Sequence, residues 1–310
     1  MLSRHRVLFV LAVSIFAVYA SAKTPSKNLI VATRDPQAVV VVTQSLAALT
    51  GTTALSDITL QGNASYTAGS DEETGTVTLL ASGNLLSNSS LSLISGPRVE
   101  IRNGAAGVWS GFDGVQYAMA LHNCWPDAGW FYPGLSFAAL ATDTGLGLAY
   151  VGPETKNGFS VIHIQLFRVV SNAPQDFTAA VQTLSTEDLY VDASSALPLF
   201  LDYNVHPDSD YNHSIPVEIA FSGYQQMGGV SVPARVQKFF NGTLLLDLSI
   251  SSAVINSGLP ASDFNVTIQT ASNKPTGGRK PPPPTPTATG AGGHDSKSAP
   301  TASKASGGAR

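Results

Sequence analysis

The stretch VEIAFSGYQQMGGVSVPARVQKFFNGTLLLDLSI, residues 217–250, carries little charge and is interrupted twice by turn-forming pairs. These pairs are Gly228-Gly229 and Asn241-Gly242, which tolerate the positive φ angles of tight hairpin turns. Patterned segments on both sides of such turns predict antiparallel strands. The stretch holds no catalytic signature, so we expect its strands to build a surface rather than an active site.

The segments that precede this stretch also have a period of two. Val77, Leu79 and Ala81 recur at alternate positions, and Val99 and Ile101 alternate with charged residues ahead of an Asn-Gly turn pair. Strands recur roughly every 10 residues with short polar joints between them. This spacing predicts an antiparallel meander rather than alternating β-α-β units.

Three segments have helical patterns instead. Asp35 can cap a helix that has Pro36 at its first position and ends at Gly51. A second helix is predicted within residues 126–142 and a shorter one within residues 175–184. The predicted fold is therefore α+β, a strongly curved antiparallel sheet that forms an incomplete β-barrel with two or three helices as a lid.

The composition supports one folded domain. The chain has 310 residues, of which 43% are hydrophobic and 12% are charged, so it can bury a substantial core. Its single cysteine, Cys124, excludes an internal disulfide. A scaffold held together by disulfides is therefore excluded, and stability must come from the core.

The N-terminus resembles an export signal. Arg4 and Arg6 precede an apolar run of about 13 residues, and the small residues of positions 20–22 follow it. The run is too short to cross a bilayer, and no later run reaches spanning length. We predict a signal peptide over residues 1–22, cleavage near Ala22, and a mature periplasmic protein without a membrane span; an uncleaved anchor is the alternative.

Charge is distributed unevenly along the chain. Of the net charge of −4, the signal segment contributes +2 and residues 271–310 contribute +5, which leaves −11 for residues 23–270. An acidic body argues against nucleic acid as a partner. Residues 271–310 are rich in Pro, Gly, Ser, Thr and Ala, which predicts a disordered tail. This basic tail either touches an anionic cell-wall or membrane surface or is a solvated extension.

The order of these segments resembles the periplasmic lipoprotein-carrier superfamily of the LolA/LolB type, in particular its exported bacterial members. The resemblance covers residues 35–266 and is carried by DPQAVVVVTQSLAAL (35–49), YVGPETKNGF (150–159) and YQQMGGVSVPARV (224–236). It implies a half-barrel over residues 23–270 whose helical lid covers an apolar cavity, which holds lipid acyl chains in the known carriers. Arg34, Arg98 and Arg102 are candidates for the arginine that gates the lid in those carriers.

We accordingly predict a non-enzymatic carrier or binding protein for a lipid or a lipidated partner. An envelope protein-binding or sensor module with the same fold is the alternative. The residues predicted to line the cavity are Val39, Val42, Leu46, Val99, Ile101, Trp109, Trp130, Phe137, Leu140, Phe221 and Val236. Which alternate residues of a strand face inward depends on the strand register, which the sequence leaves open.

The search for catalytic residues finds two weak candidates. Ser136 lies in GLSFA (134–138), which lacks the last glycine of a nucleophile elbow. His206 and His213 bracket a loop with two aspartates, where a polar turn is the more common interpretation than a metal site. A hydrolase is therefore the less favoured alternative, and we predict no cofactor, metal or catalytic residue.

Overall fold

The computed structural model describes residues 32–267, all of which belong to one compact unit. The predicted signal peptide (1–22) and the predicted tail (271–310) lie outside the described residues, as do residues 23–31 and 268–270 of the predicted domain. The helices are α1 (Pro36–Thr50), α2 (Gly134–Ala139) and α3 (Gln175–Leu184), with the 3-10 turns η1 (Leu121–Cys124) and η2 (Ala261–Phe264).

Thirteen strands occupy most of the described residues. They are β1 (Asp57–Ala68), β2 (Asp71–Ser82), β3 (Leu86–Leu93), β4 (Gly96–Asn103), β5 (Ala106–Ser110), β6 (Gln116–Ala118), β7 (Leu146–Lys156), β8 (Phe159–Arg168), β9 (Glu187–Asp192), β10 (Pro198–Val205), β11 (Ile215–Met227), β12 (Val230–Phe240) and β13 (Thr243–Ile255).

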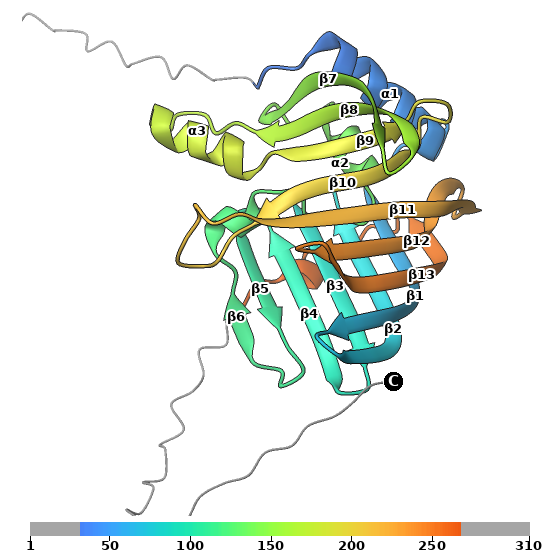
Figure 1. Ribbon diagram of the computed structural model, residues 1–310, viewed down its shortest axis with the longest axis vertical. Helices are drawn as coiled ribbons and strands as arrows, with labels where there is room; N and C mark the ends of the chain where they lie inside the picture. Colours follow the sequence, from blue (N-terminus) through green and yellow to red (C-terminus); the bar gives the residue numbers. More distant parts are fainter. Residues whose placement is uncertain (1–31, 268–310) are drawn as a thin grey trace, which may run out of the picture. The chain divides into compact units, whose positions relative to one another are not determined.

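All thirteen strands form a single antiparallel sheet, in the order β6-β5-β4-β3-β2-β1-β13-β12-β11-β10-β9-β8-β7. Strands that are consecutive in the chain are neighbours in the sheet, except for β6 and β7, which form its two edges. The first and last strands, β1 and β13, pair in its middle. The sheet is strongly curved, and its edge strands β6 and β7 do not pair with each other (Figure 1). The predicted fold class, an incomplete β-barrel with few helices, is confirmed.

Hairpin turns and close approaches of the backbone shape the sheet. Asn241 and Gly242 join β12 to β13 with φ angles of 49° and 75°, as their sequence predicts. Gly62 in β1 and Gly75 in β2 are needed for a different reason. A Cβ at Gly62 would lie 2.0 Å from the carbonyl oxygen of Ser249, and one at Gly75 would lie 1.9 Å from that of Ser92. Only glycine permits these close approaches.

The first and third helices match their predictions. Asp35 accepts a hydrogen bond from the Gln37 N–H at the start of α1, and Gly51 ends the helix with a φ of 59°. The second helix is much shorter than predicted. Pro133 has no N–H to donate, and Asp127 bonds the Gly129 N–H, so the chain turns irregularly until α2 begins. No helix of residues 32–267 is long and apolar enough to cross a bilayer.

Helices α1 and α2 pack on one face of the sheet, which we call the core face; the opposite face is the outer face. Ala38, Val42 and Leu49 of α1 join one hydrophobic cluster with Leu135 and Phe137 of the α2 region. The same cluster contains side chains from β1, β2, β3 and β7 to β13. The core therefore lies between the curve of the sheet and these two helices.

Candidate ligand-binding site

Strand register assigns residues to the two faces. Leu79 of β2, which is fully buried in the core, pairs with Ser89 of β3, and Ser89 pairs with Glu100 of β4. Glu100 in turn pairs with Trp109 of β5. Directly paired residues of an antiparallel sheet point to the same face, so Trp109 lies on the core face. There it is 43% exposed and stacks on Tyr117, with 4.6 Å between the ring centroids.

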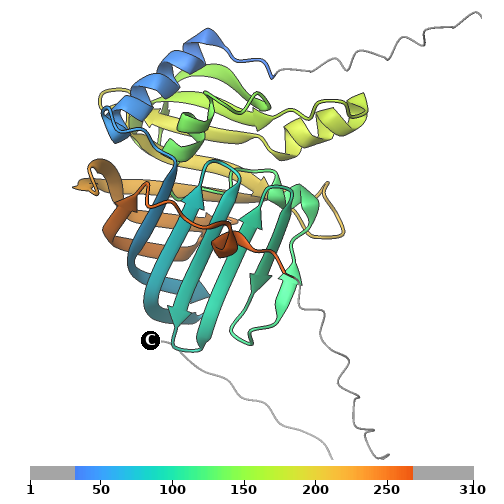
Figure 2. The ribbon, with the colours of Figure 1, turned by 180° about the vertical axis from the view of Figure 1, so that it is seen from behind.

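Val99 and Ile101 lie between these positions and therefore point to the outer face. We predicted that they share an apolar surface with the helices, and this assignment must be corrected. The C-terminal turn η2 covers this part of the outer face instead. Figure 2 shows this turn lying across the strands. Asn88 and Asn103 donate hydrogen bonds to its backbone carbonyls, and Phe264 is fully buried there.

Most of the other predicted lining residues are core side chains. Five of them are at most 3% exposed: Val42, Trp130, Phe137, Phe221 and Val236. Leu46 and Leu140 pack against this cluster and are partly buried. Val39 is 38% exposed, because α1 turns it away from the cluster. The middle of the core face is thus filled by the protein's own side chains.

A pocket of about 450 Å³ opens at one end of the sheet, where the ends of β1, β11, β12 and β13 meet. Ile215 and Phe240 line it, and both lie on the core face because Phe240 pairs with the buried Val217. Phe240 is 38% exposed. Other lining residues are Thr67, Ala68, Gly69, His213, Ser214, Asn241, Thr243, Leu244 and Leu245. Our sequence analysis missed this pocket, although its FFNGT turn was recognised.

Lys238 is the cation closest along β12 to this pocket. It pairs with Ile219 on one side and Leu246 on the other, both buried, so it lies on the core face. Its Nζ atom is 4.4 Å from the ring centroid of Trp130, within the range of a cation–π interaction. The side chain is partly exposed.

Arginines hold the irregular segment around α2 in place. Arg34 donates to the carbonyls of Leu140, Asp143 and Leu146, and Arg102 donates to the carbonyls of Pro126 and Asp127. Of the three arginines that the resemblance suggested, these two contact the segment that covers the sheet.

The third candidate, Arg98, is placed elsewhere. It forms an ion pair with Glu73 at 2.9 Å and lies over the Tyr66 ring. It therefore makes none of the contacts to the α2 segment that Arg34 and Arg102 make.

Two carboxyl groups are buried here: Asp127 belongs to this segment, and Glu187 is the first residue of β9. Glu187 accepts a hydrogen bond from the Asp127 N–H, and the Asp127 carboxylate accepts one from Ser136. Burial and the neighbouring Asp127 charge raise the pKa of Glu187 to about 8. Burial also raises the pKa of Asp127, opposed by the Ser136 hydrogen bond and the charges of Arg168 and Arg102.

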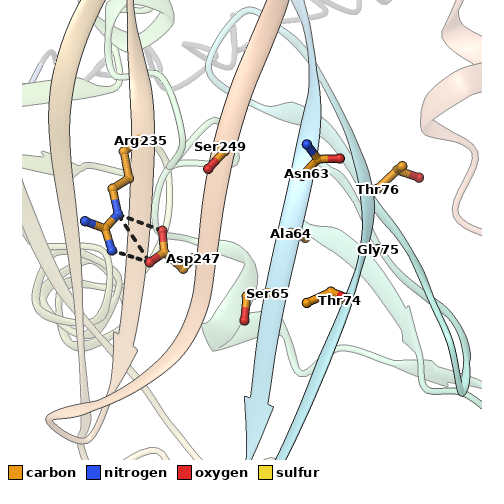
Figure 3. Close-up of a pocket in the computed structure, with 9 residues that line it drawn as sticks. All are labelled: Asn63, Ala64, Ser65, Thr74, Gly75, Thr76, Arg235, Asp247 and Ser249. Atoms are coloured by element: carbon orange, nitrogen blue, oxygen red, sulfur yellow. Dashed lines mark hydrogen bonds and ion pairs between the residues drawn. The ribbon is translucent and has the colours of Figure 1, made fainter.

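A second opening, a groove of about 660 Å³, lies on the outer face across β12, β13, β1 and β2 (Figure 3). Arg235 and Asp247 form an ion pair at its side, and Asn63, Thr76 and Ser249 add polar groups. Most of the side chains that line the groove are polar, and it does not continue the apolar surface of the core face.

The residues of the hydrolase alternative are unfavourably placed. Ser136 is 2% exposed, and its hydroxyl is bonded to Asp127. The His206 ring contacts the backbone carbonyl of His213 at 3.2 Å. Cys124 is buried, and burial raises the pKa of its thiol. Within residues 32–267, no group of three or more His, Cys, Asp or Glu side chains is arranged to hold a metal ion.

Comparison with known proteins adds structural neighbours. No family model and no curated protein matches the sequence. A LolA superfamily protein of Nitrosomonas europaea matches with 10% identity over 74% of this chain and 97% of its own, at a TM-score of 0.48. A DUF1329 family protein of Desulfovibrio piger matches with 11% identity over 74% and 96%, at a TM-score of 0.44.

A third solved structure is a domain assigned to an outer membrane lipoprotein-sorting protein of Vibrio parahaemolyticus. It matches with 12% identity over 74% of this chain and 96% of its own, at a TM-score of 0.44.

Proposed function

We propose that this chain is an exported, non-enzymatic binding protein that holds an acyl chain of a lipid or of a lipidated partner at the open end of its sheet. The observation that carries the proposal is the pocket of about 450 Å³ that Ile215 and Phe240 line on the core face. Its volume lies within the range of small-molecule sites. Its lining is mixed, and the apolar side chains of Ile215, Phe240 and Leu244 form the part that suits hydrocarbon.

Burial of hydrocarbon alone supplies enough free energy for such binding. Removing a methylene group from water is worth about 0.8 kcal/mol. A chain with ten methylenes buried gains about 8 kcal/mol in gross terms, from which the costs of association and ordering are subtracted. This binding needs no acid, base or metal.

The test is direct binding of tritiated palmitate and tritiated hexadecanol to the purified protein, with lipid extraction and mass spectrometry of the natively purified sample. Phe240→Asp places a charge in the pocket and is expected to weaken binding of both probes at least about tenfold. Phe159→Asp is the matched control, because Phe159 is 50% exposed on the outer face. Equal binding by both variants, or none by the wild type, contradicts the proposal.

A second candidate is a protein-binding or sensor module. Exposed apolar side chains of β5, β6 and the loop between them favour it: Trp109, Phe112, Val115 and Tyr117. Apolar side chains grouped in this way are typical of interaction surfaces. The two candidates differ in their expected ligands. Persistent absence of lipid, together with a protein retained by an immobilised wild type but not by Trp109→Ser, supports the second.

A further inference from the structure

We propose that Lys238 is the anion-binding residue of this protein, and that its ligand is an amphiphile with a negatively charged carboxylate or phosphate headgroup. This inference rests on the proposed function and specifies the class of ligand. It is carried by the position of one ammonium group on an apolar face, where no carboxylate of residues 32–267 pairs with it.

The register fixes that position. Lys238 is flanked across the sheet by Ile219, which is fully buried, and by Leu246, which is 5% exposed. Phe240 follows two residues later on the same face of β12, about 7 Å along the strand. Lys238 is therefore the next core-face residue along β12 from Phe240, which lines the pocket.

Lys238 differs from the other lysines and arginines of the described chain in its surroundings. Residues 32–267 contain seven lysines and arginines, and six bind carboxylates or backbone carbonyls: Arg34, Arg98, Arg102, Lys156, Arg168 and Arg235. Within residues 32–267, Lys238 has no ion-pair or hydrogen-bond partner, and its ammonium group lies over the Trp130 ring. The acidic side chain nearest in register, Asp247, points to the outer face, where Arg235 and Gln237 bind it.

This arrangement leaves the ammonium group able to bind an anion. A lysine offers three N–H donors, and a cation–π contact with Trp130 positions the charge without satisfying those donors. An unpaired charge among apolar side chains is costly, and a bound carboxylate or phosphate removes that cost with charge-assisted hydrogen bonds. The hydrocarbon of the same molecule then reaches the pocket beside Phe240.

The test compares ligands that share a hexadecyl or hexadecanoyl chain and differ in their headgroup. Palmitate and hexadecyl phosphate carry the charge, and hexadecanol lacks it. The wild type is expected to bind both anions about tenfold or more tightly than hexadecanol. Preference for one of the two anions assigns the headgroup to a carboxylate or a phosphate. Lys238→Met is expected to remove the preference for anions, and Lys238→Arg is expected to keep it.

Arg235→Gln is the matched control, because it removes one positive charge from the same strand on the outer face. It is expected to preserve the preference for anions. Binding of hexadecanol reports whether each variant still folds with an intact pocket. If the wild type binds hexadecanol as tightly as the anions, or if Lys238→Met keeps the preference, this inference is wrong and the proposed function stands. If no probe binds to the wild type, the proposed function fails together with it.

Discussion

Glu187 and Asp127 are two carboxyl groups that are buried together. Their surroundings are not uniformly acidic, because Arg102 and Arg168 approach the pair. The raised pKa of Glu187 means that the folded protein holds a proton that the unfolded chain, with a pKa near 4.5, releases earlier. The stabilising effect of that proton is complete below pH 4.5 and is lost as the pH rises to about 8.

Substituting Glu187 with glutamine tests this linkage. The free energy of unfolding of the wild type is expected to fall by up to about 1.4 kcal/mol per pH unit across this range, and that of Glu187→Gln is expected to fall less. Urea denaturation at pH 5, 6.5 and 8 measures the difference. Asp208→Asn, at an exposed carboxylate in the loop before β11, should retain the wild-type slope. Parallel pH profiles for wild type and Glu187→Gln would show that Glu187 is already ionised.

Gly62 in β1 and Gly75 in β2 permit the close approach of neighbouring strands in the curved sheet. Their Cβ positions are occupied by backbone carbonyls of the adjacent strands, which no rotamer change relieves. A methyl group at either position must therefore push neighbouring strands apart.

Gly75→Ala is expected to destabilise the fold by about 1–3 kcal/mol, the typical cost of forcing additional atoms into a packed structure. Gly111→Ala is the matched control, because its Cβ would meet only a side-chain oxygen of Asp113 at 3.7 Å. Urea midpoints of the two variants give the comparison. A Gly75→Ala midpoint equal to that of the control means that the strands separate at little cost.

The turn η2 acts as a strap on the outer face of β3 and β4. It brings a fully buried phenylalanine, Phe264, to strands whose outward residues Val99 and Ile101 need cover. A second, smaller hydrophobic cluster thus lies on the outer face of the sheet.

Truncating this side chain tests the contribution of the strap. Phe264→Ala is expected to cost about 3–5 kcal/mol in the free energy of unfolding, the usual range for a buried phenylalanine. Phe112→Ala, at a side chain that is 64% exposed, is expected to cost far less. A loss below about 1 kcal/mol for Phe264→Ala would mean that the strap adds little to stability.

The sequence predicted correctly those features that depend on residues close together in the chain. The ends of α1 were predicted from Asp35, Pro36 and Gly51, because capping interactions act within one turn of the helix. The Asn241-Gly242 turn is equally local. Which residues of β4 face the helices depends instead on contacts with distant parts of the chain. Val99 and Ile101 are apolar and alternate correctly, yet η2, which arrives about 160 residues later, gives them a different environment.

The same limit applies to the candidate site. Trp130 and Lys238 meet over a separation of more than 100 residues, and the pocket draws on four strand ends. The sequence predicted an apolar interior and its aromatic residues. The register and the tertiary contacts are needed to show that this interior is filled in its middle and open at one end.

The pairing of β1 with β13 in the middle of the sheet affects how the whole molecule is made. About 200 residues separate Ile58 from its partner Ile255. The contacts that offset the entropy cost of closing this loop can therefore form only after the final strand has been synthesised. A nascent chain has an unprotected strand edge at its centre until then, and a prematurely terminated product keeps that edge permanently. Incomplete copies of this protein should therefore aggregate or depend on chaperones.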